Sequence, residues 1–212
     1  SQTVMNQFAS DQRSLWHQYL ANNGYIIVSV DNRGTGARGA TFKKEIYKNM
    51  GKVEVEDQIS VAKYFAKKSF VDSTRIGIWG WSYGGFMSTL ALERGADVFK
   101  TAIAVAPVID WRYYDTIYTE RYMQTPQLNP EGYRTASPIY EAAKIKGNYL
   151  LIHGTGDDNV HFQNAVSMAD ALQHYNIPFQ TMFYPNRNHG IYGGETRRHL
   201  YTLMSKFIFE EL

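Results

Sequence analysis

The chain has 212 residues, of which 44% are hydrophobic and 20% are charged, so the composition suits one folded domain with a sizeable core rather than a disordered segment. Its 22 basic and 20 acidic residues are interspersed and leave a formal charge of +2, which argues against a nucleic-acid partner. The absence of cysteine excludes disulfides and thiolate metal sites. The sequence contains no run of 18 apolar residues, so it predicts no membrane-spanning helix. Because the sequence starts with neither methionine nor a signal pattern, we expect it to belong to a longer protein.

Short apolar runs rich in β-branched residues alternate with segments of helical periodicity, which is typical of a parallel sheet covered by helices. The expected strands are residues 25–30, 75–79, 101–106, 149–153 and 179–184. Apolar stripes predict helices around residues 59–66, 165–172 and 200–207. We therefore predict an α/β fold whose sheet is mostly parallel and carries helices on both faces.

Residues 111–130 interrupt this alternation, because they contain no strand pattern and are rich in tyrosine. The tyrosines of interest are Tyr113, Tyr114, Tyr118 and Tyr122. The stretch follows the predicted end of the third strand, and ligands of such sheets bind beyond the carboxyl ends of the strands. It is therefore expected to line a ligand site, with a plain aromatic core as the alternative.

Residues 80–84 read Gly-Trp-Ser-Tyr-Gly and fit the pattern G-x-S-x-G. The pattern alone is weak, but here it follows a predicted strand and precedes a helical stretch at residues 86–92. A sharp strand-turn-helix elbow needs small neighbours so that its serine stands clear of the backbone, and Gly80, Gly84 and Gly85 provide them. Ser82 is therefore the expected nucleophile, and a simple strand-helix turn is the alternative.

A serine nucleophile needs a base, and the base needs an acid; in α/β hydrolases these follow in the order Ser, Asp or Glu, His. Asp157 and Asp158 share the loop after the strand at 149–153, and spacing does not choose between them. His189 lies in the loop after the last strand, where Gly190 allows close approach. His189 is therefore the expected base.

The other histidines are expected to be structural. His153 closes an apolar strand, and His161 opens a helix that also carries Phe162. The remaining three, His17, His174 and His199, lie on predicted helices, where a solvated or packed role is the default.

The oxyanion of an acyl-transfer reaction needs hydrogen-bond donors, and in this fold one is the backbone N–H after the nucleophile, here that of Tyr83. The second donor has no candidate, since the sequence contains no HGGG-type motif. The one early glycine-rich loop, residues 31–36, completes no phosphate-binding motif and is expected to be a structural turn.

Four segments together resemble the catalytic domains of the dipeptidyl peptidase branch of the prolyl oligopeptidase family. They are the serine motif at 80–85, the tyrosine-rich run Tyr-Tyr-Asp-Thr-Ile-Tyr-Thr-Glu-Arg-Tyr-Met at 113–123, the run at 153–161 and the His-Gly pair at 189–190. Residues 53–58 also match the family's pattern before its helix. The resemblance covers essentially the whole chain and implies the α/β-hydrolase fold.

The resemblance implies specific roles for residues of this sequence. Asp157 would be the triad acid, and Asn159 would bind the carbonyl of the residue before proline. A compact apolar pocket for the proline ring would be walled by Val108, Trp111, Tyr114, Tyr118 and Val160.

The implied function is that of a serine exopeptidase that releases X-Pro and X-Ala dipeptides from peptide amino termini through an acyl-enzyme. The implied partners are peptides with proline or alanine second from the amino terminus, no cofactor or metal is implied, and the full-length protein would be a homodimer that is periplasmic, secreted or membrane-anchored. The same triad would serve another acyl hydrolase, such as an acylaminoacyl peptidase or esterase. A non-catalytic binding domain is the third reading, but Ser82, Asp157 and His189 are all present.

Two features of the family are expected upstream of this chain: a tyrosine that is the second oxyanion donor, just before the segment matched by Ser1–Thr3, and a β-propeller whose glutamate pair holds the substrate's amino terminus. We therefore expect residues 1–212 to be a single catalytic domain, truncated at its amino end. By itself it should show little peptidase activity.

Overall fold

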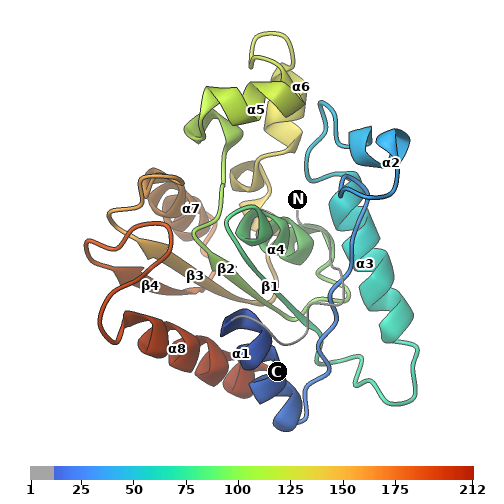
Figure 1. Cartoon of the computed structure of the whole chain (residues 1–212), viewed down its shortest axis with the longest axis vertical. Coiled ribbons are helices and arrows are strands. Elements are labelled where there is room, and N and C mark those ends of the chain that lie inside the picture. The colour runs from blue at the N-terminus through green and yellow to red at the C-terminus, as the bar shows by residue number, and fades with distance from the viewer. Residues whose placement is uncertain (1–11) are drawn as a thin grey trace.

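The computed structural model describes residues 12–212, and Ser1–Thr3 lie outside them. Four parallel strands form a sheet in the order β1-β2-β3-β4 (Figure 1). Their bounds are Gly77–Trp81 for β1, Thr101–Val105 for β2, Asn148–Gly154 for β3 and Gln180–Tyr184 for β4. Since every strand runs in the same direction, the four carboxyl ends meet at one edge.

Helices occupy most of the remaining sequence. The α-helices are α1 Gln12–Asn22, α2 Ala40–Lys44, α3 Val53–Phe65, α4 Tyr83–Arg94, α5 Thr116–Met123, α6 Pro130–Thr135, α7 Gln163–His174 and α8 Thr196–Glu211. Three short 3-10 helices are η1 Trp111–Tyr113, η2 Pro138–Tyr140 and η3 Ala142–Lys144. No helix among the described residues is long and apolar enough to cross a membrane.

Different sets of helices cover the two faces of the sheet, as Figure 1 shows. Ala102 and Ala104 of β2 pack with residues of α3, α4 and α7, whereas Ile103 and Val105 pack with residues of α1 and α8. This alternation follows from the two-residue period of a strand. The prediction of an α/β fold with helices on both faces is confirmed.

Four of the five predicted strands are confirmed, with ends that differ by at most two residues. The helices expected near residues 59–66, 165–172 and 200–207 are α3, α7 and α8. His161 does not open a helix, because α7 begins at Gln163 and His161 lies in the preceding turn, where its Nδ1 accepts the Gln163 N–H at 3.2 Å.

The strand predicted at residues 25–30 is wrong. This segment pairs with no strand of the described chain, and Ile26, Ile27 and Val28 are 52%, 36% and 43% exposed. β-Branched residues suit a pleated, half-buried surface, but this composition does not by itself make a strand when no neighbouring strand provides ladder hydrogen bonds. Residues 31–36 form the turn that was expected, with the Thr35 N–H donating to the Asn32 carbonyl at 3.2 Å.

Residues 107–145 leave the sheet after β2 and return before β3. They contain η1, α5, α6, η2 and η3, and no strand, as the sequence predicted. Figure 1 shows α5 and α6 side by side, outside the layers that cover the sheet. This excursion places the tyrosine-rich stretch beyond the carboxyl end of β2.

Candidate active site

Ser82 occupies a sharp turn between β1 and α4. Its backbone has φ 60° and ψ −117°, in the left-handed half of the map that non-glycine residues rarely adopt. A Cβ at Gly80 would lie 2.1 Å from the Gly84 carbonyl oxygen, and one at Gly85 would lie 2.9 Å from the Val105 carbonyl oxygen. Glycine is therefore required at both positions for the elbow to close.

The elbow is tied to the next strand and to its own helix. The Ser82 N–H donates to the Val105 carbonyl at 2.8 Å, and the Ser82 carbonyl accepts the Phe86 N–H at 3.0 Å. Tyr83 is the first residue of α4, and the first N–H groups of a helix have no intrahelical acceptor. The Tyr83 N–H thus lies at the positive end of the helix dipole, next to Ser82.

Asp157 lies in the loop after β3 and is 4% exposed. Its Oδ1 accepts the N–H groups of Asn159 and Val160, both at 2.9 Å. Its Oδ2 lies 2.8 Å from Nδ1 of His189 and 3.3 Å from Nε2 of His153. Burial disfavours the charged carboxylate, but the hydrogen bonds from His153, His189 and the Asn159 amide outweigh it and hold the pKa of Asp157 well below its usual range.

His189 lies in the loop after β4, with its side chain 22% exposed. Its carbonyl accepts the Trp81 indole N–H at 3.0 Å, which ties the histidine loop to the residue before Ser82. The histidine loop also packs on the Asp157 loop, since the Gly156 N–H donates to the Arg187 carbonyl at 3.0 Å. A Cβ at Gly154 would lie 2.2 Å from that same oxygen, so the close approach needs glycine there.

The structure thus brings His189, the expected base, together with Asp157, which the family resemblance implied as the acid. Asp158 is exposed and makes no hydrogen bond to a histidine among residues 12–212, so Asp157 is the aspartate that contacts His189. In the same part of the chain, the Ser82 hydroxyl and the His189 ring make no hydrogen bond with each other. Contacts of this kind often form only in the substrate complex, and the serine-histidine contact stays a prediction.

His153 has a place in this site that sequence reasoning did not assign. Its side chain is fully buried, and its Nε2 faces the Val160 carbonyl at 2.8 Å and Oδ2 of Asp157 at 3.3 Å. Because both neighbours are acceptors, Nε2 must carry the proton. His153 therefore donates to the Val160 carbonyl, and the same N–H lies close to the carboxylate that also contacts His189. Its position four residues before Asp157, near the end of β3, was the available signal.

The residues expected to form the apolar pocket lie in one cluster. Val108, Trp111 and Val160 are buried there, with Tyr114 and Tyr118 packed against them. Trp111 stacks on Tyr118 at 6.1 Å and 16°, and Tyr114 meets Tyr118 edge to face at 5.3 Å. Both tyrosines are half-buried, so the rings form a wall with an accessible side. Burial raises the pKa of both hydroxyls, which keeps them neutral donors.

Asn159 connects this wall to the acid loop. Its side-chain oxygen accepts the Tyr114 hydroxyl at 2.8 Å, and its own N–H donates to Asp157. Tyr114 lies just before α5, at the end of η1, so its contact with Tyr118 does not depend on one continuous helix.

Glu54, in the first turn of α3, is a buried polar residue that sequence reasoning missed. Its Oε1 accepts a short hydrogen bond from the Tyr83 hydroxyl, directly behind the elbow. The signal available in the sequence was its place in the family pattern at residues 53–58. No group of three or more His, Asp or Glu side chains that could hold a metal ion occurs in the described part of the chain.

Comparisons with known proteins identify the family of this chain. Residues 12–212 match the model of the prolyl oligopeptidase family. The chain is 46% identical over 212 residues to prolyl endopeptidase FAP of Mus musculus, and 48% identical over 197 residues to dipeptidyl peptidase 4 of Felis catus. These matches cover 98% and 91% of this chain but 27% and 26% of the relatives.

Among solved structures, dipeptidyl peptidase 4 of Porphyromonas gingivalis is similar with a TM-score of 0.96 and 48% identity, over 100% of this chain and 30% of that one. A putative dipeptidyl aminopeptidase IV of Bacteroides ovatus is similar with a TM-score of 0.90 and 37% identity, over 93% of this chain and 28% of that one. The α/β-hydrolase fold is thereby confirmed, and this chain belongs to the prolyl oligopeptidase family.

Proposed function

We propose that the full-length protein is a serine-type dipeptidyl peptidase that releases X-Pro and X-Ala dipeptides from peptide amino termini. The observation that carries the proposal is the 2.8 Å hydrogen bond between Asp157 and His189, on loops that pack beside the Ser82 elbow. A buried carboxylate that holds one imidazole nitrogen leaves the other nitrogen free to act as a base. The family relationship makes a serine peptidase the matching chemistry.

In the proposed reaction, the Ser82 hydroxyl attacks the carbonyl carbon of the scissile bond and gives its proton to Nε2 of His189. Asp157 stabilises the imidazolium, and the Tyr83 N–H donates to the oxyanion. When the intermediate collapses, the C–N bond breaks and His189 gives its proton to the leaving amine. Water then attacks the acyl ester with His189 again as base, which releases the dipeptide and restores Ser82.

We propose that the ring of proline, or the methyl group of alanine, binds in an apolar pocket. The walls of this pocket would be Val108, Trp111, Tyr114, Tyr118 and Val160. Flat rings can enclose a rigid pyrrolidine at low entropic cost. The Asn159 side chain would bind the carbonyl of the residue before proline.

The chain spans about a quarter of the length of the curated relatives it matches. We propose that the full-length protein adds a β-propeller with an anchor for the substrate's amino terminus, that an upstream tyrosine is the second oxyanion donor, and that the protein acts as a homodimer. Peptides are the proposed partners.

The proposal is tested on the full-length protein with Gly-Pro-p-nitroanilide beside a simple ester, and by covalent labelling of Ser82 with a serine-reactive phosphonate. We expect labelling together with rapid cleavage of the Gly-Pro amide. Labelling with ester hydrolysis alone would favour another acyl hydrolase. No labelling would favour a binding domain.

A further inference from the structure

Glu54 is a buried carboxyl group to which the proposed mechanism gives no role. It is 2% exposed, although a glutamate is seldom buried without a partner. Each carboxyl oxygen accepts one hydrogen bond: Oε1 from the Tyr83 hydroxyl and Oε2 from the Gly51 N–H. Glu54 therefore joins the turn before α3 to the residue after Ser82.

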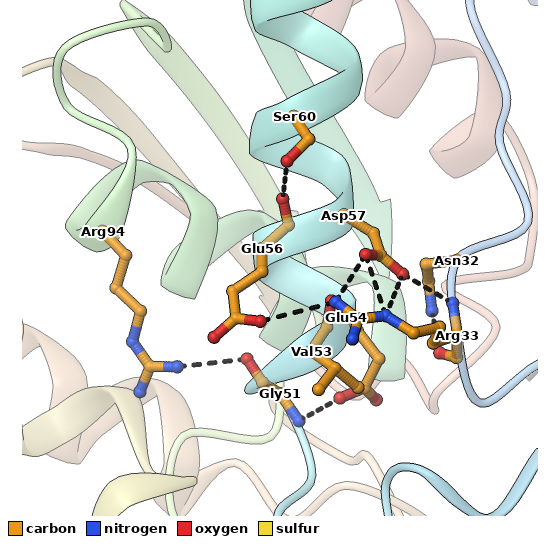
Figure 2. Close-up of polar contacts among 9 residues, drawn as sticks. All are labelled: Asn32, Arg33, Gly51, Val53, Glu54, Glu56, Asp57, Ser60 and Arg94. Atoms are coloured by element: carbon orange, nitrogen blue, oxygen red, sulfur yellow. Dashed lines mark hydrogen bonds and ion pairs between the residues drawn. The ribbon is translucent and has the colours of Figure 1, made fainter. Parts of the chain in front are cut away.

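The Gly51 side of this connection is held firmly. Figure 2 shows the Gly51 peptide between two side chains, with its N–H donating to Glu54 and its carbonyl accepting from Arg94 at 3.1 Å. Arg94 is itself paired with Glu141 at 2.9 Å. Gly51 has φ 78°, and a Cβ there would lie 2.5 Å from the Phe86 ring, so the turn packs directly on α4.

The neighbouring acids of α3 are engaged elsewhere. Asp57 binds the Arg33 guanidinium at 2.7 and 3.0 Å and also accepts the Arg33 N–H at 2.8 Å. Glu56 reaches the same guanidinium at 3.4 Å, and Figure 2 shows it apart from the Glu54 carboxyl. The start of α3 is thus anchored on both sides, which leaves Glu54 little freedom to move.

The Tyr83 ring makes ring contacts in addition to its hydrogen bond with Glu54. It meets Phe86 edge to face at 5.1 Å and lies tilted against Trp111 at 5.6 Å, in the cluster that also holds Tyr114 and Tyr118. Ring contacts alone allow sliding and rotation, whereas a hydrogen bond to a carboxylate sets where the hydroxyl must lie.

We propose that Glu54 is a positioning residue that holds the Tyr83 ring against Trp111 as a wall of the substrate pocket, and thereby favours substrates with a proline ring over simple esters. This inference rests on the proposed function. Glu54 touches no reacting atom, so its effect acts through Tyr83.

The charge of Glu54 provides a readout. Burial raises the pKa of Glu54 to about 7, and the hydrogen bonds from Tyr83 and Gly51 offset only part of this effect. Among residues 12–212, the titratable and charged groups near the pair are Tyr118 and Tyr122 from α5, and Arg94 from α4, which reaches the Gly51 peptide. Below pH 7 the protonated carboxyl accepts more weakly from the Tyr83 hydroxyl, so the wall should loosen.

The test measures, in the full-length protein, the ratio of kcat/KM for Gly-Pro-p-nitroanilide to kcat/KM for p-nitrophenyl acetate between pH 6 and 9. Both substrates use the same proposed triad, so an effect on the triad itself largely cancels in the ratio. We expect Glu54→Gln to lower the ratio about tenfold at pH 8, as suits the loss of one charge-assisted hydrogen bond, and to remove its pH dependence near 7. Glu56→Gln, two residues along the same helix, should change neither.

A ratio for Glu54→Gln within twofold of the native value would overturn the inference. If that variant does not fold, Tyr83→Phe removes the same hydrogen bond from the other side and should lower the ratio similarly; a native ratio would overturn the inference as well.

A second measurement is independent of activity. With 3-fluorotyrosine placed at position 83, the fluorine resonance of the native protein should titrate near pH 7, and that of Glu54→Gln should not. Absence of the native titration would refute the role of Glu54. Failure of the native protein to cleave the Gly-Pro amide would instead refute the proposed function.

Discussion

Asp157 contacts His189 and Glu54 contacts Tyr83, and the pKa values of these two buried carboxyl groups are shifted in opposite directions. They are 4% and 2% exposed, yet the pKa of Asp157 lies well below its usual range whereas that of Glu54 is raised to about 7. Asp157 receives three hydrogen bonds, from His189 and two backbone amides, and the His153 ring N–H lies 3.3 Å from its carboxylate. Glu54 receives two, from Tyr83 and Gly51.

The difference shows that burial alone does not decide the charge of a carboxyl group. Desolvation opposes the charged form at both sites, and the number of donors determines whether it is overcome. The surroundings of Asp157 favour its charged form beside His189. The raised pKa of Glu54 means that this carboxyl group changes its charge near neutral pH.

The largest expected effect concerns the proposed triad of Ser82, Asp157 and His189. In the full-length protein, Ser82→Ala or His189→Ala should abolish nearly all turnover of Gly-Pro-p-nitroanilide, and Asp157→Asn should lower kcat by about 10⁴-fold, because the amide neither holds the correct tautomer nor stabilises the imidazolium. Asp158→Asn is the matched control and should change kcat far less. Equal losses at Asp157 and Asp158 would contradict the assignment of the acid.

The second effect concerns the stability cost of Glu54. Its folded pKa lies above its unfolded value of about 4.5, so the folded state loses stability as the pH rises from about 4.5 through 7, on the order of 3 kcal/mol. Glu54→Gln lacks this cost. Denaturant titrations would measure the free energy of unfolding of Glu54→Gln and of the native protein. The variant's value minus the native value should rise between pH 5 and pH 8. A constant difference would show that Glu54 does not titrate in this range.

The third effect tests the second imidazole on Asp157. His153→Gln should lower kcat roughly tenfold with little change in KM, because the ring N–H that lies 3.3 Å from the carboxylate and favours its charged form is lost. His161→Gln, in the nearby turn, is the control. Steady-state kinetics would give kcat, and thermal unfolding would give the stability of the variant. A lower stability with an unchanged kcat would show that the role of His153 is wholly structural.

The smallest expected effect concerns Tyr114 in the proposed apolar pocket. Tyr114→Phe keeps the ring but removes the hydroxyl that donates to Asn159 at 2.8 Å, which is worth about 1 kcal/mol. We expect KM for Gly-Pro-p-nitroanilide to rise several-fold while kcat changes little. Tyr113→Phe is the control, and an equal rise in KM for both variants would show that the contact with Asn159 does not orient the substrate.

Local patterns carried most of the fold prediction. Strands β1 to β4 and helices α3, α7 and α8 could be located because apolar periodicity reports which side of an element is buried. The segment at 25–30 has the same composition but remains unpaired, since composition cannot tell whether a neighbouring strand provides hydrogen bonds. Pairing is a property of two segments, and a single-segment pattern does not contain it.

The sequence by itself determined the elbow around Ser82 and the order of acid and base, because G-x-S-x-G and the loops after parallel strands are local features. The spacing of residues left Asp157 and Asp158 open and the family resemblance favoured Asp157, whereas only the tertiary structure decided that Asp157 contacts His189, that His153 lies beside Asp157 and that Glu54 contacts Tyr83. Those contacts depend on the depth and direction of side chains from segments far apart in the chain. Such geometry is set by packing, which residue spacing does not record.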